Sequence, residues 1–157
     1  MDDIMSAINQ KPDGIAVVEG SKEFPHIKGT VFFYQKNGYV LVVAGFSGLP
    51  KGNEECERPI YGFHIHSGEN CTGKAEDFFA DSKGHYNPKD CPHPYHAGDM
   101  PPLFGCRGSA FSAFLTDRFK VKDIIGKTVI VHSKPDDFTT QPSGNAGEKI
   151  ACGKIFE

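Results

Sequence analysis

Three absences narrow the classes of protein to which this 157-residue chain can belong. No apolar run approaches the roughly 20 residues that a membrane-spanning helix needs. There is no internal repeat and no low-complexity segment. The formal net charge is −3 and the lysines and arginines are scattered, so no basic patch of the kind that binds nucleic acid or an anionic membrane is present. We therefore expect a small solute as partner, and neither nucleic acid nor a membrane.

The amino terminus also lacks the pattern of a secretion signal. MDDIMSAINQ carries two acidic residues where a signal peptide has a basic region followed by an apolar one. A cytoplasmic location is the expectation. A periplasmic or extracellular location is the alternative if the chain is a processed form.

Turn-forming residues, in contrast, are abundant. The 18 glycines and 11 prolines favour many turns over long helices, so the composition indicates an all-β fold. The length is that of a single domain over 1–157, with its core at about 15–157. Short strands are predicted at about 15–20, 108–115, 127–133 and 149–155.

Two further strands are predicted in the segment 27–46, IKGTVFFYQKNGYVLVVAGF. Runs of apolar, β-branched and aromatic residues flank Lys36-Asn37-Gly38, and Asn-Gly is the strongest short-range signal for a β-hairpin. The sequence therefore predicts a hairpin that turns at these residues.

Residues 67–106 have almost no periodic apolar pattern and consist largely of Gly, Pro, Asp, Asn, Cys and His. Structureless segments longer than about 12–15 residues are uncommon in compact domains unless they are functional or disordered, so something must hold this one in place. A second loop, which contains Gly and Pro, covers 134–148.

Four potential metal ligands are closely spaced within the first of these loops: His85, His93, His96 and Asp99. Imidazoles with one carboxylate form a four-ligand set typical of a closed zinc site. The alternative, a polar turn that happens to contain histidine, leaves some forty residues with nothing to organise them. The spacing therefore favours a zinc site.

The remaining histidines give weaker signals. His64 and His66 share one face of a short predicted strand, because strand side chains alternate. Taken alone, this pair is more typical of a solvated strand face than of a metal site. His132 ends an apolar strand, where a lone histidine is more often structural. His26 lies outside every cluster, and we expect it at the surface.

The five cysteines are odd in number, so at least one thiol is free or pairs between chains. Cys91 and Cys106 lie near the two ends of the histidine-rich part of the loop. An additional bridge between them is one hypothesis, and two ordinary thiols are the alternative. Cys56 would then be the unpaired cysteine.

Taken together, five segments resemble the copper/zinc superoxide dismutase family. YGFHIHSG, GHYNP, HPYHAGDM, IGKTVIVHSKPDD and GNAGEKIACG are similar to that family's ligand strand, zinc loop, second copper strand and C-terminal strand, in the family's order. The similarity covers roughly 15–157, and HPYHAGDMP is more like the bacterial branch. The resemblance implies an eight-stranded antiparallel Greek-key β-barrel with a long zinc loop and an electrostatic loop.

The resemblance also implies a site for two metals that share one ligand. The copper ligands would be His64, His66, His85 and His132. The zinc ligands would be His85, His93, His96 and Asp99. His85 would therefore bridge copper and zinc through its two ring nitrogens.

Three further roles follow from the resemblance. Asp136 falls where the family has an aspartate that links a copper ligand to a zinc ligand. Cys71 and Cys152 match the family's intrasubunit disulfide. Lys149 occupies the position at which the family usually has an arginine guarding copper, and Lys134 is a weaker candidate for attracting an anion. Lysine keeps the charge but lacks the planar fork of the guanidinium group.

The activity implied by the resemblance is superoxide dismutation, an oxidoreductase reaction with superoxide as substrate. Copper would change oxidation state while zinc fixes the loop, and His85 would take up a proton that is later delivered to peroxide. One alternative is a non-enzymatic module that stores or delivers copper and zinc. Another is a zinc-only domain, which leaves the remaining histidines unused. A homodimer is compatible with all three hypotheses.

Overall fold

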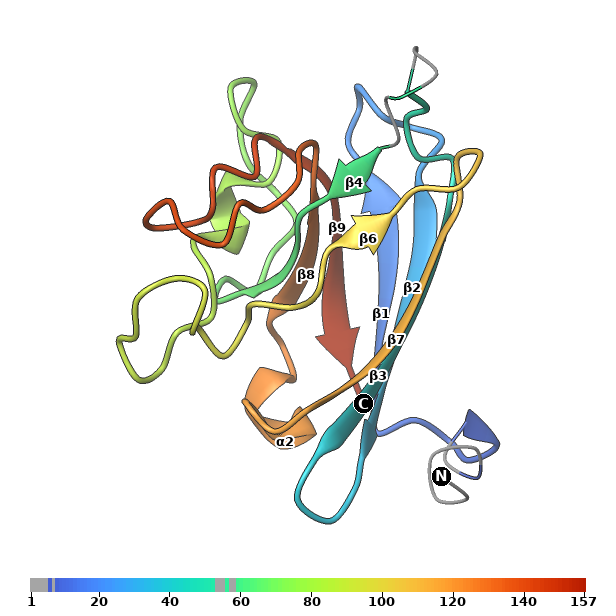
Figure 1. The fold of residues 1–157 in the computed structure, drawn as a ribbon, viewed down its shortest axis with the longest axis vertical. Helices are drawn as coiled ribbons and strands as arrows, with labels where there is room; N and C mark the ends of the chain where they lie inside the picture. Colours follow the sequence, from blue (N-terminus) through green and yellow to red (C-terminus); the bar gives the residue numbers. More distant parts are fainter. Residues whose placement is uncertain (1–5, 7, 53–55, 57–58) are drawn as a thin grey trace.

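The computed structural model describes residues 6, 8–52, 56 and 59–157. Seven strands form one antiparallel sheet in the order β5-β8-β9-β1-β2-β3-β7, and the sheet curls strongly (Figure 1). The strands are β1 (Gly14–Gly20), β2 (Lys28–Gln35), β3 (Val40–Ser47), β5 (Phe63–His66), β7 (Ala110–Thr116), β8 (Thr128–His132) and β9 (Lys149–Phe156).

Two short strands, β4 (Ile60–Tyr61) and β6 (Leu103–Phe104), pair in front of β1 and β2 (Figure 1). Only Gly62 separates β4 from β5, so these two are one interrupted strand. A tight turn between Cys106 and Ser109 joins β6 to β7. In the described residues, the curled sheet and the β4–β6 pair together form a half-barrel, which confirms the predicted all-β antiparallel fold.

Helix contributes little to this fold. The described part of the chain contains two short helical elements with defined bounds, the 3-10 turn η1 (Ala80–Ser82) and the helix α2 (Val121–Ile124). No helix there is long and apolar enough to cross a membrane.

The predicted hairpin is confirmed in β2 and β3. Gln35 pairs with Val40 at its closed end, and the Lys36 N–H donates to the Tyr39 carbonyl at 2.8 Å. Gly38 has a φ of +88°, a conformation that glycine adopts at little cost. The Asn-Gly signal therefore marks the turn correctly.

The hydrophobic core lies inside the barrel and is built from alternate side chains of the strands. Phe33 of β2 and Phe63 and Ile65 of β5 are fully buried there. Burying a side chain of this size stabilises the fold by about 1.5–3 kcal/mol. Because strand side chains alternate, His64 and His66 of β5 point to the outside of the barrel wall.

The disulfide expected between Cys71 and Cys152 is present, with a Cα–Cα distance of 5.6 Å and a sequence separation of 81. It fastens the start of the long loop to β9. The hypothesis of a second bridge is wrong, because Cys91 and Cys106 are both free thiols. Cys91 is held beside Asn87, whose side-chain amide bonds its backbone, whereas Cys106 lies in the turn between β6 and β7. Cys56 is free and exposed as well.

The disulfide gives a stability prediction. Because a cross-link over this separation removes much loop entropy from the unfolded chain, Cys71→Ser should lower the free energy of unfolding by roughly 4 kcal/mol. Urea denaturation checks this value. Cys91→Ser, at a free and half-buried thiol, is the matched control and should shift the midpoint little. Equal shifts in the two variants would contradict the assignment.

Candidate metal centre

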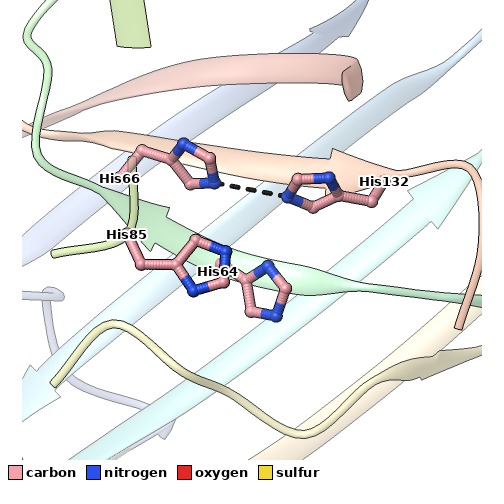
Figure 2. A group of neighbouring side chains, drawn as sticks. All are labelled: His64, His66, His85 and His132. Atoms are coloured by element: carbon pink, nitrogen blue, oxygen red, sulfur yellow. Dashed lines mark hydrogen bonds between the residues drawn. The ribbon is translucent and has the colours of Figure 1, made fainter. Parts of the chain in front are cut away.

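Three histidines converge on the outside of the barrel wall where β5 and β8 pair. His64 and His66 project from β5, and His132 lies at the end of β8, where a bulge interrupts the register after Val131. Figure 2 shows the His66 and His132 rings facing each other, with their Nε2 atoms 3.2 Å apart. His85 of the long loop completes this group (Figure 2).

The long loop reaches the site by pairing with the free edge of β5. The Ile65 N–H donates to the Gly98 carbonyl at 2.9 Å, and the Tyr86 N–H donates to the Ile65 carbonyl at 2.8 Å. A Cβ atom on Gly98 would lie 2.2 Å from the Ile65 carbonyl oxygen, so only glycine permits this approach. The pairing sets His85 opposite His66 and Asp99 opposite His64.

The structure brings all seven predicted ligand residues together in two groups of four. In each group, one ligand atom per residue lies within 4.8 Å of the others. The copper-side cluster is His64, His66, His85 and His132, and the zinc-side cluster is His85, His93, His96 and Asp99. His85 belongs to both clusters.

Hydrogen bonds fix the orientation of the three copper-side rings that come from strands. His64 donates from Nε2 to Asp136 at 2.7 Å, His66 from Nδ1 to the Lys83 carbonyl at 2.7 Å, and His132 from Nδ1 to the Gly147 carbonyl at 3.2 Å. Because each of these oxygens accepts a hydrogen bond, the ring nitrogen that faces it carries the proton. The other nitrogen of each ring therefore carries a lone pair.

Those lone pairs are directed at one another, which is unfavourable unless a cation lies among them. The Nε2 atoms of His66 and His132 are both acceptors at 3.2 Å. Among the described residues, His64 Nδ1, His85 Nε2 and His93 Nδ1 are buried without a hydrogen-bond partner. His93 Nδ1 is 3.1 Å from a carboxylate oxygen of Asp99, but without hydrogen-bond geometry. Because buried polar atoms are seldom left unpaired, the donor set fits two metal ions.

Asp136 connects the two clusters. One carboxylate oxygen accepts from His64 and the other accepts from His93 Nε2 at 2.8 Å. Burial acts to raise the pKa of Asp136, but the hydrogen bonds from His64 and His93 outweigh it and hold that pKa well below its usual range. A Cβ atom on Gly144 would lie 2.0 Å from this carboxylate, so the loop over Asp136 requires glycine there.

Burial also keeps the histidines neutral, as metal ligands must be. Desolvation lowers the pKa of His132 to about 3, with the neighbouring His64 adding to the effect. Desolvation likewise lowers the pKa values of His64, His66 and His96. At neutral pH these rings present lone pairs without competition from protons.

Two polar side chains that the sequence reasoning missed hold the zinc side of the loop. Arg118, which follows β7, donates from Nη1 to the carbonyls of Pro94 (2.9 Å), His96 (3.3 Å) and Asp99 (3.4 Å). The Gln141 side chain exchanges two hydrogen bonds with the backbone of His93, at 2.7 and 2.8 Å. No sequence pattern marks either residue, because each acts on backbone atoms far along the chain.

One pocket opens onto the copper-side cluster, and His66, His85 and His132 line it together with Lys149. The Lys149 Nζ atom lies 2.9 Å from Asp77. Lys134 is exposed and does not line this pocket, so the structure does not support it as a guide for an anion.

The antiparallel barrel carries two adjacent, histidine-rich clusters on its outer wall, and the clusters share one imidazole. This arrangement defines a metalloprotein with a dinuclear centre. Comparison with known proteins identifies which class this is. The family model described as "Copper/zinc superoxide dismutase" matches residues 27–155. The chain belongs to the copper/zinc superoxide dismutase family, which uses copper and zinc.

Two relatives show how far the similarity extends. "Superoxide dismutase [Cu-Zn] A" of Xenopus laevis is 34% identical over 155 residues, which cover 90% of this chain and 95% of the relative. "Superoxide dismutase [Cu-Zn] 2" of Aquifex aeolicus is 32% identical over 142 residues, covering 81% and 78%. The amphibian and bacterial identities are similar, so the bacterial resemblance of HPYHAGDMP stays a prediction.

The buried histidines predict the pH dependence of the metal-free protein. In the unfolded chain a histidine has a pKa of about 6.5, whereas folding lowers the pKa of His132 and its neighbours. The unfolded state therefore binds more protons below about pH 6.5. Stability should therefore fall as the pH drops below about 6.5, with His132 contributing about 1.4 kcal/mol per pH unit down to pH 5 and His64 and His66 acting in the same direction. Thermal unfolding of metal-free protein at pH 7 and pH 5 measures this, and an unchanged midpoint would contradict it.

The Arg118 contacts predict a selective effect on zinc. Arg118→Gln removes the donors that fix three loop carbonyls, so zinc should pass to a chromogenic chelator about tenfold faster while copper retention changes less. Arg107→Gln, at an exposed arginine in the turn between β6 and β7, is the control. Equal acceleration in both variants would show that Arg118 has no specific role.

Proposed function

We propose that this chain catalyses the dismutation of superoxide to oxygen and hydrogen peroxide. In this proposal His64, His66, His85 and His132 hold copper, and His85, His93, His96 and Asp99 hold zinc. The single observation that carries the assignment is the membership of His85 in both clusters, with Asp136 joining them from outside. The curated relatives are named as enzymes of this activity, which favours it over a storage or delivery module.

The two metals contribute different chemistry. Bound copper supplies a one-electron change of oxidation state, which zinc cannot undergo. The protein's own contribution is to hold the rings. Asp136 fixes His64 and His93 at once, and the Lys83 and Gly147 carbonyls fix His66 and His132. The ligand geometry is therefore set before either metal binds.

His85 is the residue that we assign to proton transfer. Its Nδ1 atom faces the zinc-side cluster, 2.8 Å from Asp99 and 3.2 Å from His96. Its Nε2 atom is buried beside the copper-side histidines and has no hydrogen-bond partner among the described residues. This atom can hold a proton next to the pocket, where peroxide needs one.

Lys149 is the cation that we assign to the superoxide anion. Its side chain is mostly buried, with 15% exposed, and it lines the same pocket as His66 and His132. An ammonium group provides a point charge and up to three N–H donors. It would therefore favour the approach of a small anion without the geometric selectivity of a guanidinium.

The proposal also includes a single domain, an oligomeric state and a compartment. A homodimer stays a prediction. The compartment stays a prediction. The Cys71–Cys152 disulfide is typical of oxidising compartments.

The activity is tested by loading the protein with copper and zinc and following superoxide decay after a radiolytic or photochemical pulse. We expect decay that is first order in superoxide, with a rate proportional to the concentration of metal-loaded protein, and two protons consumed for each peroxide formed. Fully copper-loaded protein that does not accelerate superoxide decay would overturn the proposed function.

The copper and zinc assignments are tested by His132→Ala. Because this residue belongs only to the copper-side cluster, the variant should lose most of its copper and at least about 100-fold in activity while it retains zinc. Metal analysis of the purified variant measures both. His26→Ala, at an exposed histidine outside the clusters, should keep both metals. Loss of zinc with retention of copper would show the assignment to be reversed.

A further inference from the structure

The contacts of Lys149 restrain it strongly for a residue at a pocket rim. It is the first residue of β9, and its Nζ atom donates to the Asp77 carboxylate at 2.9 Å and to the Phe79 carbonyl at 3.1 Å. An ammonium group has three N–H donors. Two of them are therefore used by these described contacts, which leaves one for an incoming anion.

The charges around this pocket are not those of an anion trap. Six acidic or lysine residues line it: Glu23, Glu76, Asp77, Lys83, Glu148 and Lys149. Four carboxylates face two ammonium groups, which gives a formal net charge of −2. A cleft lined mainly by one sign of charge repels solutes of that sign. The only directly opposed pair among the six is Asp77 with Lys149.

We propose that Asp77 is a positioning residue that holds Lys149 at the pocket rim and offsets its charge, so that anions reach the copper-side cluster more slowly than Lys149 alone would allow. This inference rests on the proposed function and refines it. It predicts that the chain's own acidic rim, and not its metal ligands, limits the capture of superoxide.

Electrostatics supports a measurable effect. At 2.9 Å from Nζ, the carboxylate turns an isolated positive charge into a dipole, whose attraction for an anion several ångströms away is much weaker. Asp77 is also partly open to solvent, with 36% of its side chain exposed, so it lies near the path of an approaching solute. The pair therefore restrains Lys149 and attracts an anion less strongly than Lys149 alone would.

The test uses copper- and zinc-loaded protein in which Asp77→Asn keeps a side-chain acceptor but removes the charge. Two readouts are needed. One is the affinity for azide, a small anion, followed by absorption spectroscopy. The other is the superoxide rate constant as a function of ionic strength. At low salt we expect azide affinity and rate constant to rise about two- to fivefold, and the difference to shrink with added salt.

A double-variant comparison separates positioning from general charge. If Asp77 acts through Lys149, the gain in azide affinity from Asp77→Asn should largely disappear in a Lys149→Gln background. Glu19→Gln, which removes a carboxylate from β1 away from this pocket, should leave azide affinity unchanged. An equal gain in both backgrounds would reduce Asp77 to one more rim charge and overturn the positioning role.

Glu76→Gln provides a second route if Asp77→Asn folds poorly. This carboxylate lines the same pocket but makes no described contact with Lys149. Its removal should therefore raise azide affinity by no more than about twofold to threefold. No change in either variant would overturn the inference. That failure is distinct from failure of the proposed function, in which wild-type metal-loaded protein would be inactive towards superoxide.

Discussion

The carboxylate of Asp136 is the constraint on which both clusters depend. One oxygen accepts from His64 on the barrel wall and the other accepts from His93 in the long loop, so a single buried group orients ligands from two distant parts of the chain. An acceptor at one ring nitrogen leaves the lone pair of the other nitrogen for a metal. The Phe138 N–H also donates to Asp136 at 2.7 Å, which fixes the carboxylate within its own loop.

The chemistry occupies one face of strands whose other face makes the barrel. In β5, Phe63 and Ile65 enter the core while His64 and His66 point outwards. The long loop is then held on this outer wall by three kinds of contact: the Cys71–Cys152 disulfide, backbone pairing with the edge of β5, and side-chain bonds to its carbonyls. Because the interior packing supplies the fold, the outer wall is available for polar residues that a core would not tolerate.

Much of this arrangement is predictable from the sequence, for identifiable reasons. The Asn-Gly hairpin and the alternation around His64 are local signals, and close spacing marks His93, His96 and Asp99 as a cluster. His132 carries no local signal and is found through the order of the family's motifs. The contacts of Arg118 and Asp77 could not be predicted, because both depend on loop backbone that folds onto distant strands. The incorrect Cys91–Cys106 bridge has the same origin, since nearness along a loop does not imply nearness in space.

The central claim is that two metals lie side by side and share His85. Anomalous diffraction from crystals of the copper- and zinc-loaded protein, recorded at the absorption edges of both metals, tests it most directly. We predict a copper peak among His64, His66, His85 and His132, and a separate zinc peak among His85, His93, His96 and Asp99. A single peak, or two peaks of which only one contacts His85, would contradict this account.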